Sequence, residues 1–229
     1  MRTSPLPVLL ALLVVPAPAS TLEVKAPGAV SLPAPRTDGK VSVEAALKTR
    51  RSVRSFAPDP LTLEEIGQLC WAAQGVTDEK GHRTAPSARA VYPLELHVLA
   101  GAVTGLPPGH YRYRPASHSL ELVAAGDRRA ELDREAVGQP WIATAPAVLV
   151  LSGRPAKLGG GDDARERERA ARFTWVEAGL AAQGFFLEAT AMGLGSTYVG
   201  GFRPAETRAV LGLPAGEEPL AVLPVGRRP

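Results

Sequence analysis

The amino-acid sequence predicts an α+β fold, in which a mixed sheet is flanked by helices. Helical and strand-like patterns are interspersed along the chain without the strict alternation that a doubly wound parallel sheet requires. One long pattern, Glu166–Leu194, predicts a helix whose apolar residues occupy nearly all faces from Phe173 onward. Because such a helix has no face that water can solvate, we expect it to be buried at the domain centre or at a subunit interface.

Shorter patterns predict the remaining elements. The first is a short helix at Val41–Thr49 with Ser42 as its N-cap. Thr62 and Glu65 form a capping box that opens a second helix, which ends before Gly75. Apolar runs predict strands, two of which form a hairpin. The predicted hairpin joins Gly109–Arg114 to Ser119–Val123. The other predicted strands are Leu94–Ala100, Ala147–Ser152, Ser196–Val199 and Leu220–Val225. Two further helices are predicted, at Arg128–Gly138 and Pro204–Leu211.

Composition is that of a globular protein without a nucleic-acid surface. The chain has 229 residues, of which 45% are apolar and 21% charged, enough for one domain with a substantial core. The net charge of +3 comes mostly from arginine. The densest arginine run, 165–172, alternates with Glu166 and Glu168, which is typical of a solvated helix start rather than a phosphate track. We therefore expect no nucleic-acid partner.

Cysteine and histidine usage predicts no metal site. Cys70 is the only cysteine and lies in an apolar helical pattern, so a buried thiol is favoured over a nucleophile. The histidines show no metal-ligand spacing, and His97 and His110 fall in strand-like segments, where a structural role is favoured.

The N-terminus is typical of a signal peptide at residues 1–19. Arg2 precedes the apolar run Leu6–Val15, which is too short to span a bilayer, and Ala17-Pro18-Ala19 offers small residues for cleavage. We expect export, with no stable membrane insertion after cleavage; an uncleaved leader on a cytoplasmic protein is the alternative. A Pro/Ala-rich linker is predicted at residues 20–40, and the domain at residues 41–229.

The segment Arg50-Arg51-Ser52-Val53-Arg54 places three guanidinium groups and a hydroxyl within five residues. Guanidinium groups match phosphate oxygens in bidentate fashion, and like charges this close repel unless an anion balances them. A phosphate site is one interpretation; a solvated basic turn is the other.

Four segments, in order, resemble the nitroreductase family, and most closely its SagB/ThcOx-type branch. The first is Lys48–Phe56, and the second is Arg83–Glu95, with its Pro86-Ser87 pair and Tyr92-Pro93 before a strand. The third is the end of the long helix with Gly200-Gly201-Phe202, and the fourth is Leu220–Gly226. Together these matches span nearly the whole predicted domain.

The resemblance implies an α+β homodimer joined through long central helices, with FMN at the interface. It implies phosphate and ribityl contacts for Arg50, Arg51, Ser52 and Arg54, and glycine backbones close to the flavin ring at Gly200 and Gly201. It also implies that four residues line the flavin ring from the opposite subunit: Pro86, Ser87, Ala88 and Arg89. Near the end of the chain, Arg228 or Arg227 is implied to add positive charge at the phosphate.

Two departures from the family pattern bear on function. Arg89 stands where a small residue is common, which implies a more cationic ring environment. SagB-type azoline oxidases are associated with a Lys-Tyr pair, and no Lys-Tyr dipeptide occurs in this sequence, which puts azoline oxidation in doubt.

The function implied is that of an FMN-dependent oxidoreductase transferring hydride or two electrons from a donor such as NAD(P)H to a small nitro, quinone or similar acceptor. The alternatives are SagB-type oxidation of a peptide or metabolite, and an exported non-catalytic anion- or flavin-binding module. FMN would carry the chemistry, so no catalytic side chain is assigned. Tyr92 and Tyr198 are candidate proton donors, although packing at the strand entry is favoured for Tyr92.

Overall fold

A seven-stranded sheet lies at the centre of the computed structural model, which describes residues 29–229. Its strands are β1 (Ala29–Ser31), β3 (Leu94–Ala100), β5 (Gly109–Arg114), β6 (Ser119–Ala125), β7 (Ala147–Gly153), β8 (Leu194–Ser196) and β9 (Glu218–Arg227). They are ordered β1-β6-β5-β3-β7-β9-β8, and every ladder between them is antiparallel. A separate pair of strands, β2 (Leu61–Thr62) and β4 (Val103–Thr104), is parallel. The mixed sheet predicted from the sequence is therefore an antiparallel sheet with a parallel pair beside it.

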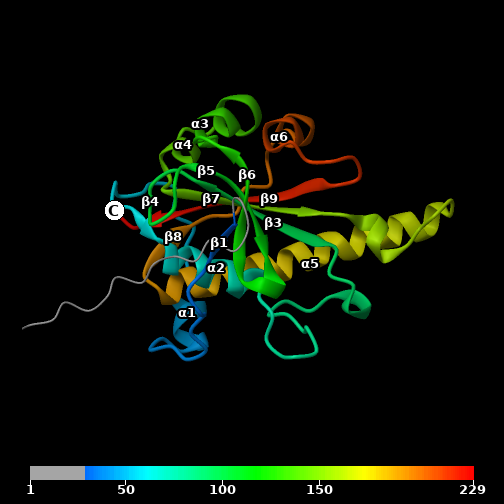
Figure 1. Ribbon diagram of the computed structural model, residues 1–229, viewed down its shortest axis with the longest axis horizontal. Helices are drawn as coiled ribbons and strands as arrows, with labels where there is room; N and C mark the ends of the chain where they lie inside the picture. Colours follow the sequence, from blue (N-terminus) through cyan, green and yellow to red (C-terminus); the bar gives the residue numbers. More distant parts are fainter. Residues whose placement is uncertain (1–28) are drawn as a thin grey trace, which may run out of the picture.

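Helices cover both faces of the sheet (Figure 1). One face carries α1 (Val43–Thr49), α2 (Leu63–Gln74) and α5 (Ala164–Ala191), and the N-terminal end of α5 projects beyond the sheet. The other face carries the remaining α-helices, α3 (Arg129–Leu132), α4 (Trp141–Thr144) and α6 (Pro204–Leu211). The architecture is therefore three layers, and the α+β prediction is confirmed.

Each face of the sheet buries its own hydrophobic cluster. The cluster towards α2 and α5 includes Leu96, Val98 and Phe185, and the cluster towards α3, α4 and α6 includes Leu99 and Ile142. Adjacent residues of β3, such as Val98 and Leu99, point to opposite clusters because side chains alternate along a strand. The central strands β3, β7 and β9 are consequently buried on both faces, whereas β6 near the edge is partly exposed.

Local signals predicted most elements well. Ser42 caps α1 by accepting from Ala45 N, and Thr62 and Glu65 form the predicted capping box of α2. The strand at Leu94–Ala100 and the helix at Pro204–Leu211 have the predicted bounds. Cys70 is fully buried, and burial raises the pKa of its thiol, so the predicted core role is confirmed.

Three predictions are corrected in detail. Part of the predicted linker at 20–40 is ordered, since β1 pairs with the edge of β6 and Leu32 is buried. The strand predicted at Ser196–Val199 begins and ends earlier, as β8, and only Val199 forms a further bridge, to Val222. The helix predicted at Arg128–Gly138 is α3 followed by a π-helical turn, Asp133–Val137.

The predicted signal peptide lies outside the described residues, as does the beginning of the linker. Within residues 29–229, no helix has the length and apolarity needed to cross a membrane.

Candidate functional site

The segment Arg50–Arg54 is fixed against β8 by its backbone. Val53 N donates to Ser196 O at 2.9 Å, and Ser52 forms a parallel bridge with Ser196. The approach is close because residue 195 is glycine: a Cβ there would lie 2.7 Å from Val53 Cγ1. The sequence could not show this contact, which joins residues far apart along the chain.

The three arginines of this segment have different roles. Arg51 Nη1 donates to the carbonyl oxygens of Lys48 and Arg50, at 3.0 and 2.8 Å, and so satisfies acceptors at the end of α1. The guanidinium groups of Arg50 and Arg54 make no hydrogen bond or ion pair with any residue in the 29–229 range. Arg50 and Arg54 are therefore two cations without an acidic partner in the described chain, and Ser52 lies between them in the sequence.

The end of the chain reaches the same region. Arg228 Nε donates to Leu194 O, at the start of β8, at 3.1 Å. Arg227 instead binds Glu65 through both carboxylate oxygens, at 2.5 and 2.9 Å, which ties β9 to the capping box of α2. Arg228 is thus placed near the first segment, whereas the guanidinium of Arg227 is already paired.

The residues after β8 add a buried hydroxyl group and two exposed glycines. Thr197 is 2% exposed, and its Oγ1 finds no partner within the described chain. Such a buried orphan hydroxyl is rare in native structures and is often satisfied by a bound molecule or water. Gly200 and Gly201, which follow Tyr198 and Val199, are exposed. The structure therefore brings the backbone of the Arg50–Arg54 segment, Thr197 and Arg228 to the short strand β8.

The second segment, Pro86–Pro93, has a strained backbone. Arg89, Ala90 and Tyr92 have φ values of 56°, 54° and 53°, in the left-handed region that favours glycine. Tyr92 N donates to Ser87 Oγ at 2.8 Å, which closes the turn. Non-glycine residues in this region cluster at functional sites, because the surroundings must hold them there.

Glu177 of α5 anchors this strained turn. Its carboxylate is buried, and Oε1 accepts from Ala88 N at 2.8 Å. Glu177 was not among the site residues predicted from the sequence. The available signal was its isolation, since Glu177 is the only charged residue between Arg172 and Glu188 in an otherwise apolar run.

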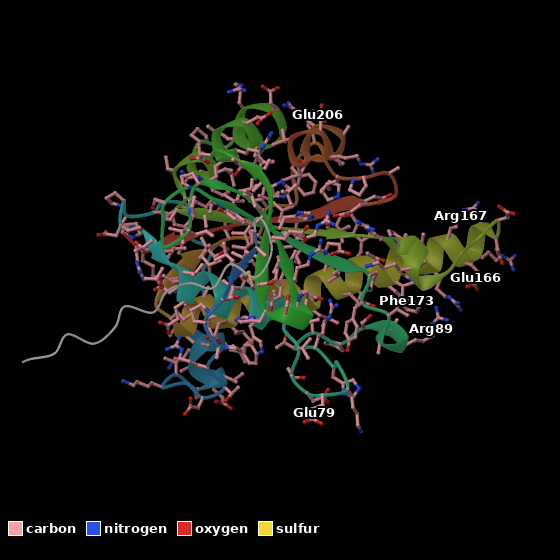
Figure 2. The ribbon with its side chains drawn as sticks, in the orientation of Figure 1. Glu79, Arg89, Glu166, Arg167, Phe173 and Glu206 are labelled. Carbon is pink, nitrogen blue, oxygen red and sulfur yellow. The ribbon has the colours of Figure 1, made fainter. Side chains whose placement is uncertain are left out.

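Arg89 points along α5 towards its N-terminal end. Its Nη2 donates to Leu158 O at 2.5 Å, although the residue as a whole is exposed, and Glu95 binds Lys157 instead. Arg89 and Leu158 line a pocket of about 390 Å³ next to the first turns of α5. Figure 2 shows Arg89 on the side of the molecule where α5 projects.

Within one chain the two segments lie far apart. The Arg89 pocket includes Arg169 of α5, whereas the Arg50–Arg54 segment contacts β8, which follows the end of α5 at Ala191. At 1.5 Å per residue, the helix rises about 33 Å between residues 169 and 191. A single chain therefore does not bring Arg54 and Arg89 to one small ligand.

An exposed apolar surface occupies α5 between these two positions. Trp175 and Val176 are 49% and 55% exposed, and Phe173 and Leu180 are nearly as open. Leu47 of α1, which packs beside α5, adds to this surface at 54%. The long helix predicted as buried is thus buried on one side only within a single chain.

A second polar cluster lies inside the sheet, and its carboxylate was missed in the sequence. Glu217 accepts from His97 Nε2 at 2.9 Å, from Ser152 Oγ at 2.6 Å and from Arg154 Nη2 at 2.7 Å. Burial alone would raise the pKa of Glu217, but these hydrogen bonds outweigh it and lower the pKa to about 2. His97 Nδ1 in turn contacts His110 Nε2 at 2.9 Å. The structural role predicted for both histidines is confirmed.

Both candidate tyrosines have a hydrogen-bond partner in the chain. Tyr198 OH donates to Leu220 O at 3.2 Å, and burial raises its pKa. Tyr92 OH accepts from Arg83 N at 3.2 Å, and its ring lies under the Arg83 guanidinium. Among residues 29–229 no cluster of His, Cys, Asp and Glu could hold a metal ion.

Comparison with known proteins identifies the family. The chain is 39% identical over 192 residues to a Methanocaldococcus jannaschii protein named "Putative nitroreductase MJ1384", covering 82% of this chain and 92% of that protein. A crystal structure from Ralstonia eutropha JMP134, also described as a putative nitroreductase, has a TM-score of 0.76 and 31% identity, covering 88% of this chain and 90% of that one.

A more distant structure, the NADPH:FMN oxidoreductase of Vibrio harveyi complexed with NAD+, has a TM-score of 0.59 and 21% identity, covering 81% of this chain and 68% of that one, and it shares the fold. The family model for the nitroreductase family matches residues 47–227, from the end of α1 through β9. The chain therefore belongs to the nitroreductase family and is a nitroreductase-like oxidoreductase.

Proposed function

We propose that this protein is an FMN-dependent oxidoreductase that transfers hydride or two electrons from NAD(P)H to a small nitro, quinone or similar acceptor. The observation that carries the proposal is the pair of uncompensated guanidinium groups, Arg50 and Arg54, held beside β8 in a chain of the nitroreductase family. The name of the Vibrio harveyi relative, an NADPH:FMN oxidoreductase, supports the choice of flavin and donor.

The residues around β8 fit a phosphorylated cofactor. Arg50, Arg54 and Arg228 would supply cations for the FMN phosphate, and Ser52 a neutral donor. Thr197 Oγ1, buried and without a partner among the described residues, would gain one from the cofactor. Arg51, expected from the sequence to join this set, is engaged by the end of α1, so its contribution would be to hold the segment in place.

Bound FMN would supply the hydride-transfer chemistry, and the protein would bind and orient the reactants. Gly200 and Gly201 are exposed and carry no side chain, so the flavin could approach their backbone closely. Ser87 and Ala88 would line the ring from a turn that Glu177 holds rigid. No side chain in either segment needs to act as a nucleophile.

We further infer a homodimer with composite sites. Antiparallel pairing of two α5 helices through the surface at Phe173, Trp175, Val176 and Leu180 would set the N-terminal part of one helix beside the C-terminal part of its partner. The second segment of one copy would then approach the Arg50–Arg54 segment of the other. This arrangement accounts both for the exposed apolar surface and for the separation of the segments within one chain.

Anaerobic spectroscopy tests the proposed activity. The purified protein, loaded with FMN, is titrated with NADPH or NADH, and menadione or a nitroarene is then added. We expect the flavin absorbance near about 450 nm to bleach with donor and to return with acceptor. Flavin that stays oxidised with both donors contradicts the proposal and favours a SagB-type dehydrogenase, reduced by its own substrate. A protein that takes up no FMN favours the non-catalytic module.

We also propose that the protein is exported, on the signal-peptide pattern of residues 1–19. N-terminal sequencing of the protein secreted from a host with a general export pathway tests this proposal, with cleavage expected after Ala19. Protein found only in the cytoplasm with Met1 or Arg2 at its N-terminus contradicts it.

A further inference from the structure

Arg89 has a backbone conformation that is unfavourable for a residue with a side chain. Its φ of 56° and that of Ala90, 54°, lie in the left-handed region, where a side chain is costly and glycine is favoured. The turn is nonetheless held by Ser87 and Glu177, and Arg89 sends its guanidinium to the carbonyl oxygen of Leu158. An observed backbone outlier of this kind motivates a search for what its side chain does.

The pocket beside Arg89 carries excess positive charge. Its charged lining residues are Arg89, Lys157, Arg169 and Glu166. Arg169 pairs with Glu166 at 2.5 Å, and Lys157 pairs with Glu95 at 2.9 Å. Arg89 has only the neutral carbonyl of Leu158, so one cation in the pocket lacks a carboxylate partner within the described chain.

The volume, about 390 Å³, is in the range of small-ligand sites. A guanidinium group binds carboxylate or phosphoryl oxygens through paired hydrogen bonds, and the nearby Lys157 and Arg169 would add donors and charge. The pocket opens from the same turn that carries Ser87 and Ala88, the residues proposed to line the flavin.

We propose that this pocket is a subsite for an anionic group, a carboxylate or phosphoryl group, carried by one of the two substrates. The inference rests on the proposed function, because the pocket matters for turnover only if flavin lies beside Ser87 and Ala88. The anion can belong to the acceptor or to the donor, since the 2′-phosphate of NADPH has the same chemistry. The substrate class of the enzyme is accordingly anionic.

Two matched pairs of substrates distinguish these sources. The acceptor pair is 4-nitrobenzoate and 4-nitrobenzyl alcohol, and the donor pair is NADPH and NADH with menadione as acceptor. We expect kcat/KM to favour the anionic member by about tenfold or more in one pair, as a charge-assisted hydrogen bond would give. No preference in either pair overturns the proposal.

Variants of the lining residues test whether the pocket is the cause. Arg169→Gln and Lys157→Gln should abolish the preference through KM, with kcat retained, and Arg169→Lys should restore part of it. Arg167→Gln removes the same charge from the same helix but lies about 200° around it from Arg169, and should leave the preference intact. A preference that survives both Arg169→Gln and Lys157→Gln overturns the proposal.

Glycine substitutions separate charge from backbone strain. Arg89→Gly removes both and should raise Tm while abolishing the preference. Ala90→Gly relieves the same kind of strain without changing charge, and should raise Tm while keeping the preference. Loss of preference in Ala90→Gly as well would show that the shape of the turn, rather than the Arg89 charge, is responsible, and would overturn the assignment.

Equilibrium binding separates failure of this inference from failure of the proposed function. Calorimetry with 4-nitrobenzoate and with adenosine 2′-phosphate needs no flavin chemistry. Binding of either ligand that weakens about tenfold in Arg169→Gln supports the subsite even if the protein proves inactive with every donor. Absence of binding by both ligands to an active flavoprotein overturns the subsite and leaves the proposed function standing.

Discussion

The buried carboxylate of Glu177 accepts a hydrogen bond from Ala88 N at 2.8 Å, which joins α5 to a turn 89 residues earlier in the chain. This contact holds three residues with positive φ, Arg89, Ala90 and Tyr92, in a conformation that their side chains disfavour. The strain and the anchor are therefore two parts of one arrangement, and removing the anchor should release the turn.

Glu177→Ala should loosen the second segment. Loss of a hydrogen bond to a charged group costs about 1.5–3 kcal/mol of stability, and the strained turn loses its anchor. We expect faster amide hydrogen exchange across residues 86–92 and a lower free energy of unfolding. Glu177→Gln keeps an acceptor oxygen and is the control. Equal exchange rates in Glu177→Ala and the wild type would show that the turn needs no anchor.

Arg54→Ala should weaken FMN binding. Its guanidinium has no partner within the described residues, so little folding stability depends on it, while a phosphate contact is worth about 1.5–3 kcal/mol of affinity. Fluorescence titration of the flavin-free protein with FMN measures the change. Arg134→Ala, which disrupts only an exposed pair with Glu135, is the control. Unchanged FMN affinity in Arg54→Ala contradicts the phosphate assignment.

Val176→Glu should dissociate the dimer. Val176 is 55% exposed in one chain, and burying an unpaired carboxylate in an apolar interface is strongly unfavourable. Light scattering at micromolar concentration should show a dimer for the wild type and a monomer for the variant. Val123→Glu makes the same change at an exposed valine of β6, 47% open, and should stay dimeric. A dimeric Val176→Glu would place the interface elsewhere.

Stability should fall as pH decreases from about 6.5. Burial lowers the pKa of His110 from 6.5 to about 3, so between these values the unfolded chain binds a proton that the folded chain excludes. The loss from pH 7 to pH 4.5 should be about 2–3 kcal/mol from this residue. The pKa of Glu217 is lowered from 4.5 to about 2, so this residue lowers the free energy of unfolding further only below pH 4.5.

Urea denaturation at pH 7, 5.5 and 4.5 measures this dependence. His110→Gln can keep a contact with His97 but does not titrate, so its stability should change less over the same interval. Parallel loss of stability in the wild type and in His110→Gln would refute the contribution of this histidine.

The sequence predicted what depends on neighbouring residues. Ser42 and Thr62 cap helices through atoms within a few positions, and the apolar run Leu94–Ala100 predicts a strand with the observed bounds. The family resemblance was confirmed by the match of residues 47–227, whereas the local pattern alone left the Arg50–Arg54 segment open between a phosphate site and a solvated turn.

Contacts between distant residues were not predictable in this way. The bond from His97 to Glu217 spans 120 positions, and that from Arg227 to Glu65 spans 162, and no local pattern encodes either partner. For the same reason β1 was not predicted. Its pairing depends on the free edge of β6, which is distant in the sequence, and not on the Pro/Ala-rich residues that surround β1. The hydrogen bonds of Arg51 to the carbonyl oxygens of Lys48 and Arg50 at the end of α1 were likewise not among the roles predicted for this residue.

The number of FMN molecules bound per chain shows whether two chains share each flavin site. The purified protein is stripped of bound cofactor and titrated with FMN, and the bound flavin is counted by its absorbance near about 450 nm. We expect a yellow dimer that binds one FMN per chain, with FMN affinity lowered by both Arg54→Ala and Val176→Glu, because each site would need both segments. A protein that stays colourless, or a monomer that binds FMN as tightly as the wild type, would contradict it.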